Sequence, residues 1–409
     1  MTTVVHPGDS LSSRQRLVYV LVLGALMALG PFTIDLYLPA FPEIDRDLNT
    51  SVSAIQLTLT ATTVGFALGQ LLVGPWSDKI GRRTPLIIAT AVHIVASLGI
   101  IFAPTVEWVG VLRVLQGMGA AGGGVVAVAM VRDLFGGLPL VRMMSRLALV
   151  NGLAPVVAPV IGSQLLLFTE WRGIFAFLSV YGLIVILAAI FFLVETQPPA
   201  RRGDLGHSSA RERYRALFTD RIFVGTAIVA GMTFTGLFGY LSSSSFLFQD
   251  VYKFDAQQYG YLFAINSVGI IIGVQSSARL AKFIGPQWIL LGAVSLMFVS
   301  GSTIAILQLF DGGLLGILIP LWFFILACGF AFPVQQVLAI DGHGGEAATA
   351  ASLMGAVNFG LAGLLSPIIG LFGIYDAVPM AVMMICTSTV SLLVIALVIR
   401  PRSVPALSR

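Results

Sequence analysis

The chain alternates between long apolar stretches and short segments in which the charged residues gather. Each apolar stretch holds about twenty residues, the number that an α-helix needs to cross the hydrocarbon core of a bilayer. The stretches are continuously apolar, which favours helices over the alternating strands of a membrane barrel. We therefore predict an all-α integral membrane protein with twelve transmembrane helices, over residues 17–40, 53–73, 85–103, 108–130, 144–168, 173–194, 222–247, 258–278, 287–308, 314–338, 348–371 and 377–399.

The composition agrees with a membrane protein. Of 409 residues, 57% are hydrophobic and only 10% are charged, whereas a soluble domain carries about 25% charged residues. The small net charge of +4 is dispersed along the chain and forms no basic face, so we expect no nucleic-acid partner. The N-terminus lacks the basic, apolar and small-residue order of a cleaved signal peptide, so we expect the first apolar stretch to remain as a helix.

The cysteines and histidines show no pattern typical of a metal site. Cys328 and Cys386 both fall within apolar stretches, where we expect small core residues and no disulfide. The four histidines are isolated in sequence and lack ligand spacing. We predict neither a metal nor a cofactor.

The positive charges orient the helices. With the N-terminus inside, 19 of the 23 Lys and Arg residues fall on the cytoplasmic side, three fall outside, and Arg113 lies within a predicted helix. Cytoplasmic loops carry such an excess. Both termini are therefore predicted to lie in the cytoplasm.

Internal repetition predicts two halves. Residues 158–162 (Ala-Pro-Val-Ile-Gly) return as residues 366–370 (Ser-Pro-Ile-Ile-Gly) 208 positions later, and Ile80-Gly81 returns as Ile284-Gly285, 204 positions later. Both pairs lie six predicted helices apart, which favours a duplicated six-plus-six architecture whose halves rock against each other. The predicted parts are an N-terminal six-helix bundle (1–194), a polar cytoplasmic linker (195–221) and a C-terminal six-helix bundle (222–409).

A charged hairpin joins the second and third predicted helices. It reads Gly-Pro-Trp-Ser-Asp-Lys-Ile-Gly-Arg-Arg over residues 74–83, and its glycines allow a tight turn. It resembles the signature loop of the major facilitator superfamily at every fixed position: Gly74, Asp78, Lys79, Gly81, Arg82 and Arg83. The resemblance implies a cytoplasmic latch between the two halves, in which Arg82 pairs with Asp133.

Further stretches extend this resemblance over most of the chain. Residues 113–121 resemble the fourth-helix motif of proton-coupled members, and residues 154–163 resemble the fifth-helix antiporter motif. Residues 33–42 and 240–246 resemble the branch of drug:proton antiporters that exports bicyclomycin and chloramphenicol. Two departures stand out: alanine or serine replaces motif glycines at 154, 158 and 163, and Met27 stands near the place of a second acid found in some multidrug members.

Two charged residues lie well inside predicted helices, Asp35 and Arg113. A charge at depth costs several kcal/mol, so each is a functional candidate. By position along their helices both lie within roughly 10 Å of the outer membrane edge. We hypothesise that Asp35 carries the proton, that Arg113 tunes this carboxylate, and that drug and proton compete for Asp35. The alternative is an Asp35 that lies at the head groups and ends its helix before Pro39.

The substrate contacts are predicted from residue type and position. Asp35 and Arg113 would be joined by Asn151, one turn before Pro155, and by Phe238 and Tyr240, whose rings could stack on a drug. Both aromatic residues could equally pack in the core. Seven uncharged polar residues lie within or near predicted helices, and buried amides more often bridge helices than bind ligands: Gln116, Asn151, Tyr240, Asn266, Gln335, Gln336 and Asn358. A pocket of this kind suits moderately apolar neutral or cationic compounds rather than sugars or phosphates.

The prediction is thus a proton-coupled antiporter that exports small drugs by alternating access, a monomer in the bacterial inner membrane whose partners are drug, protons and the lipid bilayer. A proton-coupled importer on the same fold stays open. A membrane enzyme would need catalytic or metal-binding groups at the interface, and the one cluster outside the hairpin is Asp341, His343 and Glu346 in a short glycine-rich loop. A receptor or scaffold lacks support from any appended soluble domain.

Overall fold

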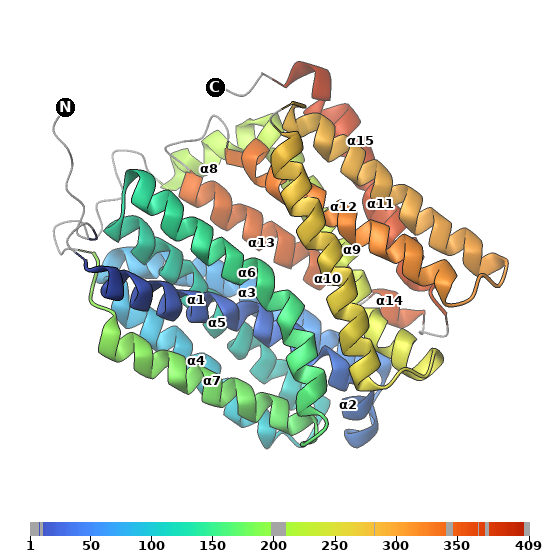
Figure 1. The fold of residues 1–409 in the computed structure, drawn as a ribbon, viewed down its shortest axis with the longest axis horizontal. Helices are drawn as coiled ribbons and strands as arrows, with labels where there is room; N and C mark the ends of the chain where they lie inside the picture. Colours follow the sequence, from blue (N-terminus) through green and yellow to red (C-terminus); the bar gives the residue numbers. More distant parts are fainter. Residues whose placement is uncertain are drawn as a thin grey trace. The chain divides into compact units, whose positions relative to one another are not determined.

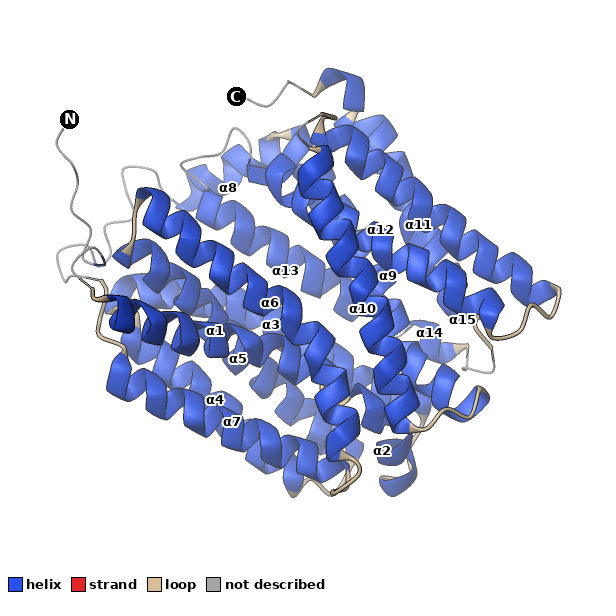
Figure 2. Cartoon of the chain, viewed as in Figure 1, coloured by secondary structure: helices blue, strands red, loops and turns tan. Residues whose placement is uncertain are grey.

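The computed structural model describes residues 8, 11–197, 210–281, 283–340, 347–366, 368–372 and 376–404. Within this part of the chain every regular element is a helix, as Figure 2 shows. Twelve long helices occupy the twelve predicted positions (Figure 1): α1 (Ser13–Asp35), α3 (Val52–Ile80), α4 (Arg83–Ile101), α5 (Val106–Leu134), α6 (Gly137–Leu165), α7 (Trp171–Phe192), α9 (Arg221–Phe246), α10 (Ala256–Leu280), α11 (Pro286–Leu309), α12 (Leu315–Ile340), α13 (Ala347–Leu365) and α15 (Val378–Val394).

Ten of the described helices are long and apolar enough to cross a membrane. The remaining two, α6 and α13, contain the shorter apolar stretches Gly152–Leu165 and Thr349–Leu365. The prediction of an all-α membrane protein with twelve helices is confirmed.

The first helix ends earlier than predicted. The apolar pattern continues to residue 40, but α1 stops at Asp35 and is followed by the short helices η2 (Leu38–Ala40) and α2 (Phe41–Asp47). Pro39 explains the break, since a proline cannot donate the next helical hydrogen bond and disfavours helical backbone at the residue before it. Asp35 is therefore the last residue of its helix.

The signature hairpin is also more helical than predicted. Helix α3 runs through Gly74 and Asp78 to Ile80, so Gly74 lies within the helix and not in the turn. The turn itself falls at Gly81, whose φ of 106° is a conformation that side chains disfavour. Helix α4 begins two residues later, at Arg83.

The predicted linker contains a helix of its own, α8 (Ala210–Thr219). Its Leu217 is fully buried in an apolar cluster with Phe223 of α9 and Met354 of α13. Asp220 then begins α9 by accepting the main-chain N–H of Ile222 (2.8 Å). This end of the linker is thus tied to the helices that follow it.

Contacts divide the chain into two compact units. The first holds residues 1–37 and 61–206, where α1 packs on α5, α6 and α7, and α4 packs on α5 and α7. The second holds residues 38–60 and 207–409, where α9 packs on α12, α13 and α15, and α12 also packs on α10 and α11.

In the first unit, glycines bring α3 and α5 into backbone contact. A Cβ atom added to Gly65 would lie 2.1 Å from the main-chain oxygen of Val114, and one added to Gly117 would lie 2.3 Å from that of Thr62. Each helix thus presents one glycine to the backbone of the other. Small residues permit such close packing of membrane helices.

The second unit repeats this arrangement between α10 and α12. A Cβ atom on Gly273 would lie 2.3 Å from the oxygen of Leu326, and one on Gly329 would lie 2.4 Å from that of Ile270. Both α10 positions follow their α3 counterparts by 208 residues, and both α12 positions follow their α5 counterparts by 212. The duplication that the sequence suggests is therefore present in the helix packing.

The segment 38–60 belongs to the second unit through specific polar contacts. Ser245 donates to the main-chain oxygen of Leu38 (2.6 Å), and Gln249 Nε2 donates to that of Pro39 (2.9 Å). Gln56 Nε2 donates to the main-chain oxygen of Ser242 (3.0 Å). The serines at positions 242–245 of α9 thus contribute to binding the segment that follows α1. This role could not be predicted from the sequence.

Candidate functional site

Arg113 of α5 is a fully buried cation that binds the end of α1. Its Nη1 donates to the main-chain oxygen of Thr33 (2.8 Å) and to Gln116 Oε1 (2.7 Å). The guanidinium carbon lies 3.9 Å from the centre of the Tyr37 ring. The last carbonyls of a helix lack helical partners, and its C-terminal end favours a cation. Arg113 supplies both a donor and a positive charge there.

Asp35 is also buried, with 5% of its surface exposed. Its carboxylate makes neither a hydrogen bond nor an ion pair with any described residue. Arg113 thus contacts Thr33 and Tyr37, on either side of Asp35 in sequence, without pairing with the carboxylate. The expected tuning of Asp35 by Arg113 is not seen as an ion pair among the described residues. One part of the alternative is present, because α1 ends at Asp35, before Pro39. The other part, a side chain that reaches water, does not match the burial of Asp35.

Gln116 connects Arg113 to α4. Its Oε1 accepts from Arg113 while its Nε2 donates to Ser97 Oγ (2.8 Å), and Ser97 in turn donates to the main-chain oxygen of His93 (2.7 Å). His93 Nδ1 lies 3.3 Å from the main-chain oxygen of Gln116. All four side chains are fully buried. Because these polar groups are buried away from water, they depend on one another for hydrogen bonds. The network therefore fixes the orientation of the Arg113 side chain.

Helix α6 also approaches the end of α1. A Cβ atom on Gly162 would lie 1.9 Å from the main-chain oxygen of Leu36, immediately after Asp35. Gly162 is the glycine kept in the altered fifth-helix motif. Its role in the structure is therefore contact with the backbone that carries the candidate proton site.

At the other end of the unit, the signature loop forms a cluster of charges. Arg82 Nε donates to Asp133 Oδ2 (2.9 Å), the pair expected from the sequence, and its Nη1 bonds Asp78 and Ser77. Burial lowers the pKa of Arg82, but the hydrogen bonds to Asp133 and Asp78 outweigh it and raise that pKa above its ordinary value. Arg82 is thus a permanent cation within the cluster.

A third chain segment of this cluster follows α7 and was not predicted from the sequence. Glu195 accepts the main-chain N–H groups of Arg82 (2.9 Å) and Arg83 (3.2 Å), at the N-terminal end of α4. Thr196 donates to Asp133 (3.1 Å), and Gln197 Nε2 donates to the main-chain oxygen of Asp78 (3.1 Å). An acid at a helix N-terminus is favoured, and an isolated acid just beyond a predicted helix was the available signal.

The candidate aromatic contacts lie in the second unit and are both buried. The Tyr240 hydroxyl accepts from Asn266 Nδ2 (3.1 Å), and its ring stacks on Phe263 at 5.9 Å. Phe238 lies in an aromatic cluster of α9 and α13, with Phe234 at 4.8 Å and Phe359 at 6.4 Å between ring centres. The structure therefore places both within helix packing.

Three of the seven uncharged polar residues are amides that bridge helices: Gln116 joins α5 to α4, Asn266 joins α10 to α9, and Gln335 joins α12 to α9 through Thr233 (3.0 Å). Gln336 is exposed, and the buried Oδ1 of Asn358 accepts no hydrogen bond from the described residues. The side chain of Asn151 on α6 lies outside the described residues, as do Asp341, His343 and Glu346. Among the described residues, no group of three or more His, Cys, Asp or Glu side chains could hold a metal ion.

Comparison with known proteins assigns the family. The sequence profile of the Major Facilitator Superfamily matches residues 21–367, which is most of the chain. The chain belongs to the major facilitator superfamily. It is thus related to membrane transporters rather than to a family of enzymes.

Two relatives cover nearly the whole chain. The "Uncharacterized MFS-type transporter YdgK" of Bacillus subtilis is 34% identical over 93% of this chain and 94% of its own. The "Bicyclomycin resistance protein homolog" of Haemophilus influenzae is 31% identical over 89% of this chain and 91% of its own. The relatives thus include a protein named after bicyclomycin resistance, the branch of the superfamily that the sequence motifs indicated.

A solved structure supports the fold independently. The crystal structure of a bacterial homolog of the human lysosomal transporter Spinster covers 97% of this chain and 100% of its own, with a TM-score of 0.75. At 14% sequence identity the likeness concerns the fold alone. The multi-pass helical fold of the superfamily is therefore established for this chain.

Proposed function

We propose that the protein is a proton-coupled antiporter that exports small, moderately apolar drugs across the bacterial cytoplasmic membrane. The observation that carries the proposal is Asp35, a buried carboxylate at the end of α1 that pairs with none of the described residues, in a superfamily of transporters. The name of the Haemophilus relative, a bicyclomycin resistance protein homolog, supports export of antibiotics as the activity.

Asp35 is the proposed proton carrier because its environment does not compensate a charge. An ionised carboxylate buried without a partner costs several kcal/mol, and protonation removes that cost. Exposure of the site to water on either side of the membrane reverses the balance and releases the proton. A drug that brings a positive charge or hydrogen-bond donors to the carboxylate would compensate its charge in the same way, so drug and proton compete for one site.

Arg113 serves this exchange by holding the backbone beside Asp35. Its bonds to Thr33 and Gln116 connect the end of α1 to α5 and, through Ser97, to α4. A shift of α5 during transport would therefore move the segment that carries Asp35. In this proposal Arg113 acts on Asp35 through the backbone and not through an ion pair between the two side chains.

The proposed drug contacts beyond these two residues are Asn151, Phe238 and Tyr240. Bicyclomycin and chloramphenicol are suitable first probes, because the predicted contact residues are one acid, one cation, an amide and two aromatic side chains. The signature cluster from Asp78 to Arg83, with Asp133, is the proposed cytoplasmic latch.

The test compares cells that express the natural chain, Asp35→Asn and Arg113→Ala in a drug-susceptibility panel, with membrane insertion checked for each variant. We expect resistance to depend on both residues. Everted vesicles with an imposed proton gradient then give the direction of transport. An exporter accumulates drug in these vesicles, whereas an importer does not, and accumulation by Asp35→Asn against a gradient would refute the proton role.

A further inference from the structure

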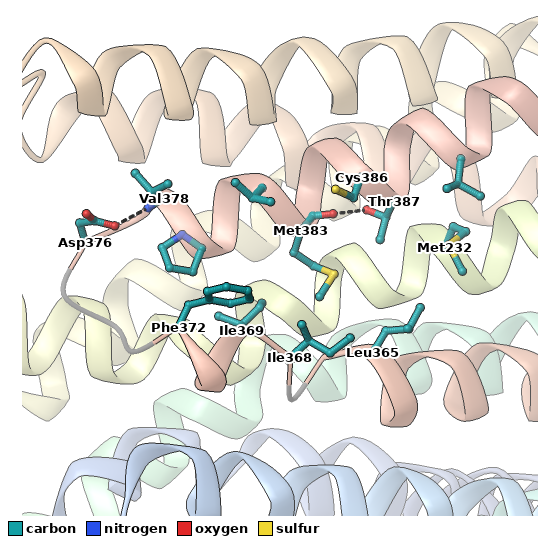
Figure 3. Close-up of a pocket in the computed structure, with 13 residues that line it drawn as sticks. Met232, Leu365, Ile368, Ile369, Phe372, Asp376, Val378, Met383, Cys386 and Thr387 are labelled. Carbon is teal, nitrogen blue, oxygen red and sulfur yellow. Dashed lines mark hydrogen bonds between the residues drawn. The ribbon is translucent and has the colours of Figure 1, made fainter.

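The second unit contains an elongated cavity of about 660 Å³ that takes no part in the proposed exchange. Its walls come from α9, α13, the short helix α14 (Ile368–Leu371) and α15, as Figure 3 shows. Its size is within the range of ligand pockets. We call it the α15 slot.

One face of α15 forms the long side of the slot. The residues that line it recur every three or four positions, at 378–379, 382–383, 386–387 and 390. This spacing marks a single helix face. From Val378 to Val390 the helix rises about 18 Å, which is slightly more than one leaflet of a hydrocarbon core about 30 Å thick. The slot therefore has the length of a lipid chain.

Among the described residues, the interior of the slot offers no free polar group to a ligand. Thr387 is buried, and its hydroxyl already donates to the main-chain oxygen of Met383 (2.8 Å). The remaining lining away from Asp376 is aliphatic, aromatic or sulfur-containing, with Met232, Ile369 and Cys386 among it. A polar drug or a sugar would leave its own groups unpaired there, whereas an alkyl chain would lose nothing.

Of the described residues that line the slot, one is charged, and it lies at one end. Figure 3 shows Asp376 beyond the start of α15, at the end of the slot opposite Met232. Its Oδ1 accepts the main-chain N–H of Val378 (2.8 Å), and the side chain is otherwise exposed. The charge bias along the sequence assigns this end of α15 to the outer membrane surface. The carboxylate is thus placed at the level of lipid head groups.

The slot is open towards its surroundings. Val382 and Val390 are 48% and 40% exposed, and Phe372 is 71% exposed. In a membrane-spanning helix such side chains face lipid. Acyl chains therefore surround the opening at all times, and any other apolar ligand would have to displace them.

We propose that the α15 slot binds one acyl chain of a membrane lipid whose primary ammonium head group pairs with Asp376. Phosphatidylethanolamine has this chemistry. Its ammonium donates hydrogen bonds to a carboxylate, whereas the choline head group has a charge but no N–H, and phosphatidylglycerol is anionic. This proposal concerns a site separate from Asp35 and Arg113, and it stands whether or not the chain exports drugs.

Cys386 provides a reporter inside the slot. It is exposed, whereas the other cysteine, Cys328, is fully buried. The purified full chain is placed in vesicles of phosphatidylglycerol mixed with equal fractions of either phosphatidylethanolamine or phosphatidylcholine. The rate of alkylation by a membrane-soluble maleimide is then measured. We expect labelling about tenfold slower with phosphatidylethanolamine, the effect of one charge-assisted hydrogen bond.

The Asp376→Asn variant should remove this difference. Asparagine still accepts the Val378 N–H, so the start of α15 is kept while the charge is lost. The matched control is Asp311→Asn, an exposed acid in the loop after α11, assigned to the same side of the membrane. Its φ of 52° suits asparagine equally well. Asp311→Asn should keep the lipid dependence.

A second measurement counts retained lipid by native mass spectrometry. Val382→Trp fills the slot and should release the phosphatidylethanolamine that the natural chain retains, whereas Leu393→Trp on the same helix, outside the slot, should not. Equal labelling in both lipids, or equal loss of lipid in both tryptophan variants, would overturn the proposal. So would protection of Cys386 by free dodecylamine but not by phosphatidylethanolamine, which would assign the slot to a soluble amphiphilic cation.

Discussion

Arg113 donates a hydrogen bond over 2.8 Å to the main-chain oxygen of Thr33, two residues before the buried carboxylate of Asp35. The same nitrogen binds Gln116 on its own helix, and the guanidinium carbon lies over the Tyr37 ring, 3.9 Å from its centre. One side chain of α5 thus fixes the backbone and the aromatic residue on both sides of the candidate proton site. Its function depends on the shape of the guanidinium as well as on its charge.

We therefore expect Arg113→Lys to fail although it keeps the positive charge. A lysine ammonium has enough donors for both acceptors, but it is shorter than arginine and lacks the planar guanidinium that covers the Tyr37 ring while Nη1 reaches Thr33 and Gln116. The loss of a buried hydrogen bond to a charged group costs about 1.5–3 kcal/mol, so proton-driven drug uptake into everted vesicles should fall at least about tenfold.

Arg172→Lys is the control for that comparison. Arg172 also lies over an aromatic ring, 4.3 Å from the centre of Trp171, but at the start of α7. Its replacement should leave uptake unchanged. Full uptake by Arg113→Lys would mean that charge alone is sufficient and that the Thr33 contact has no role.

The signature loop yields an expectation about stability. Arg82 joins Asp78 on α3 to Asp133 on α5, and only about a tenth of its side chain is exposed. Arg82→Gln leaves two carboxylates without their cation, so the unfolding free energy should fall by about 2 kcal/mol. Thermal unfolding of the purified protein in detergent measures this as a lower midpoint.

Lys79→Gln tests whether the position rather than the charge matters. Lys79 lies in the same loop with an exposed side chain. Lys79→Gln should change the thermal unfolding midpoint little, because an exposed charge contributes at most about 1 kcal/mol to stability. Equal effects of the two variants would show that Arg82 acts only through the net charge of the loop.

The sequence predicted the membrane fold because the requirement for apolar helices leaves a strong pattern. The pair of Arg82 with Asp133 followed from the signature loop. Helix ends were harder to predict. The apolar pattern of the first span continues beyond Asp35, whereas Pro39 ends the helix. An apolar pattern indicates which residues lie in the membrane. The end of a helix depends instead on where the backbone hydrogen bonds stop, which the pattern does not show.

Contacts to the main chain account for most of what the sequence did not show. Arg113 binds a carbonyl 80 residues away, and Glu195 binds N–H groups 113 and 112 residues away. Every residue has such groups, so residue type cannot identify the partner. The spacing of Asp35 and Arg113 predicted a common depth but not whether their side chains meet.

Glu195 should be a structural residue of the charged cluster. Its two oxygens accept the N–H groups of Arg82 and Arg83, which are orphan donors at the start of α4. Glu195→Ala should lower the unfolding free energy by about 1–2 kcal/mol. Glu107→Ala is the comparison, since Glu107 also lies in the first turn of its helix but has an exposed side chain. A midpoint shift no larger for Glu195→Ala than for Glu107→Ala would show that the cap contributes nothing.

The repeated glycine contacts lead to a paired expectation for the two units. Gly65→Ala and Gly273→Ala each place a methyl group within 2.3 Å of a neighbouring main-chain oxygen, so α3 must separate from α5, or α10 from α12. Overpacking of this kind costs about 1–3 kcal/mol or more, and the folded fraction after heating, measured by size-exclusion chromatography, should fall for both. Gly124→Ala on α5 and Gly292→Ala on α11 meet nothing within 4 Å and should be neutral or slightly stabilising. If only one of the two contact variants destabilises the protein, the repeated glycines do not have equivalent roles in the two units.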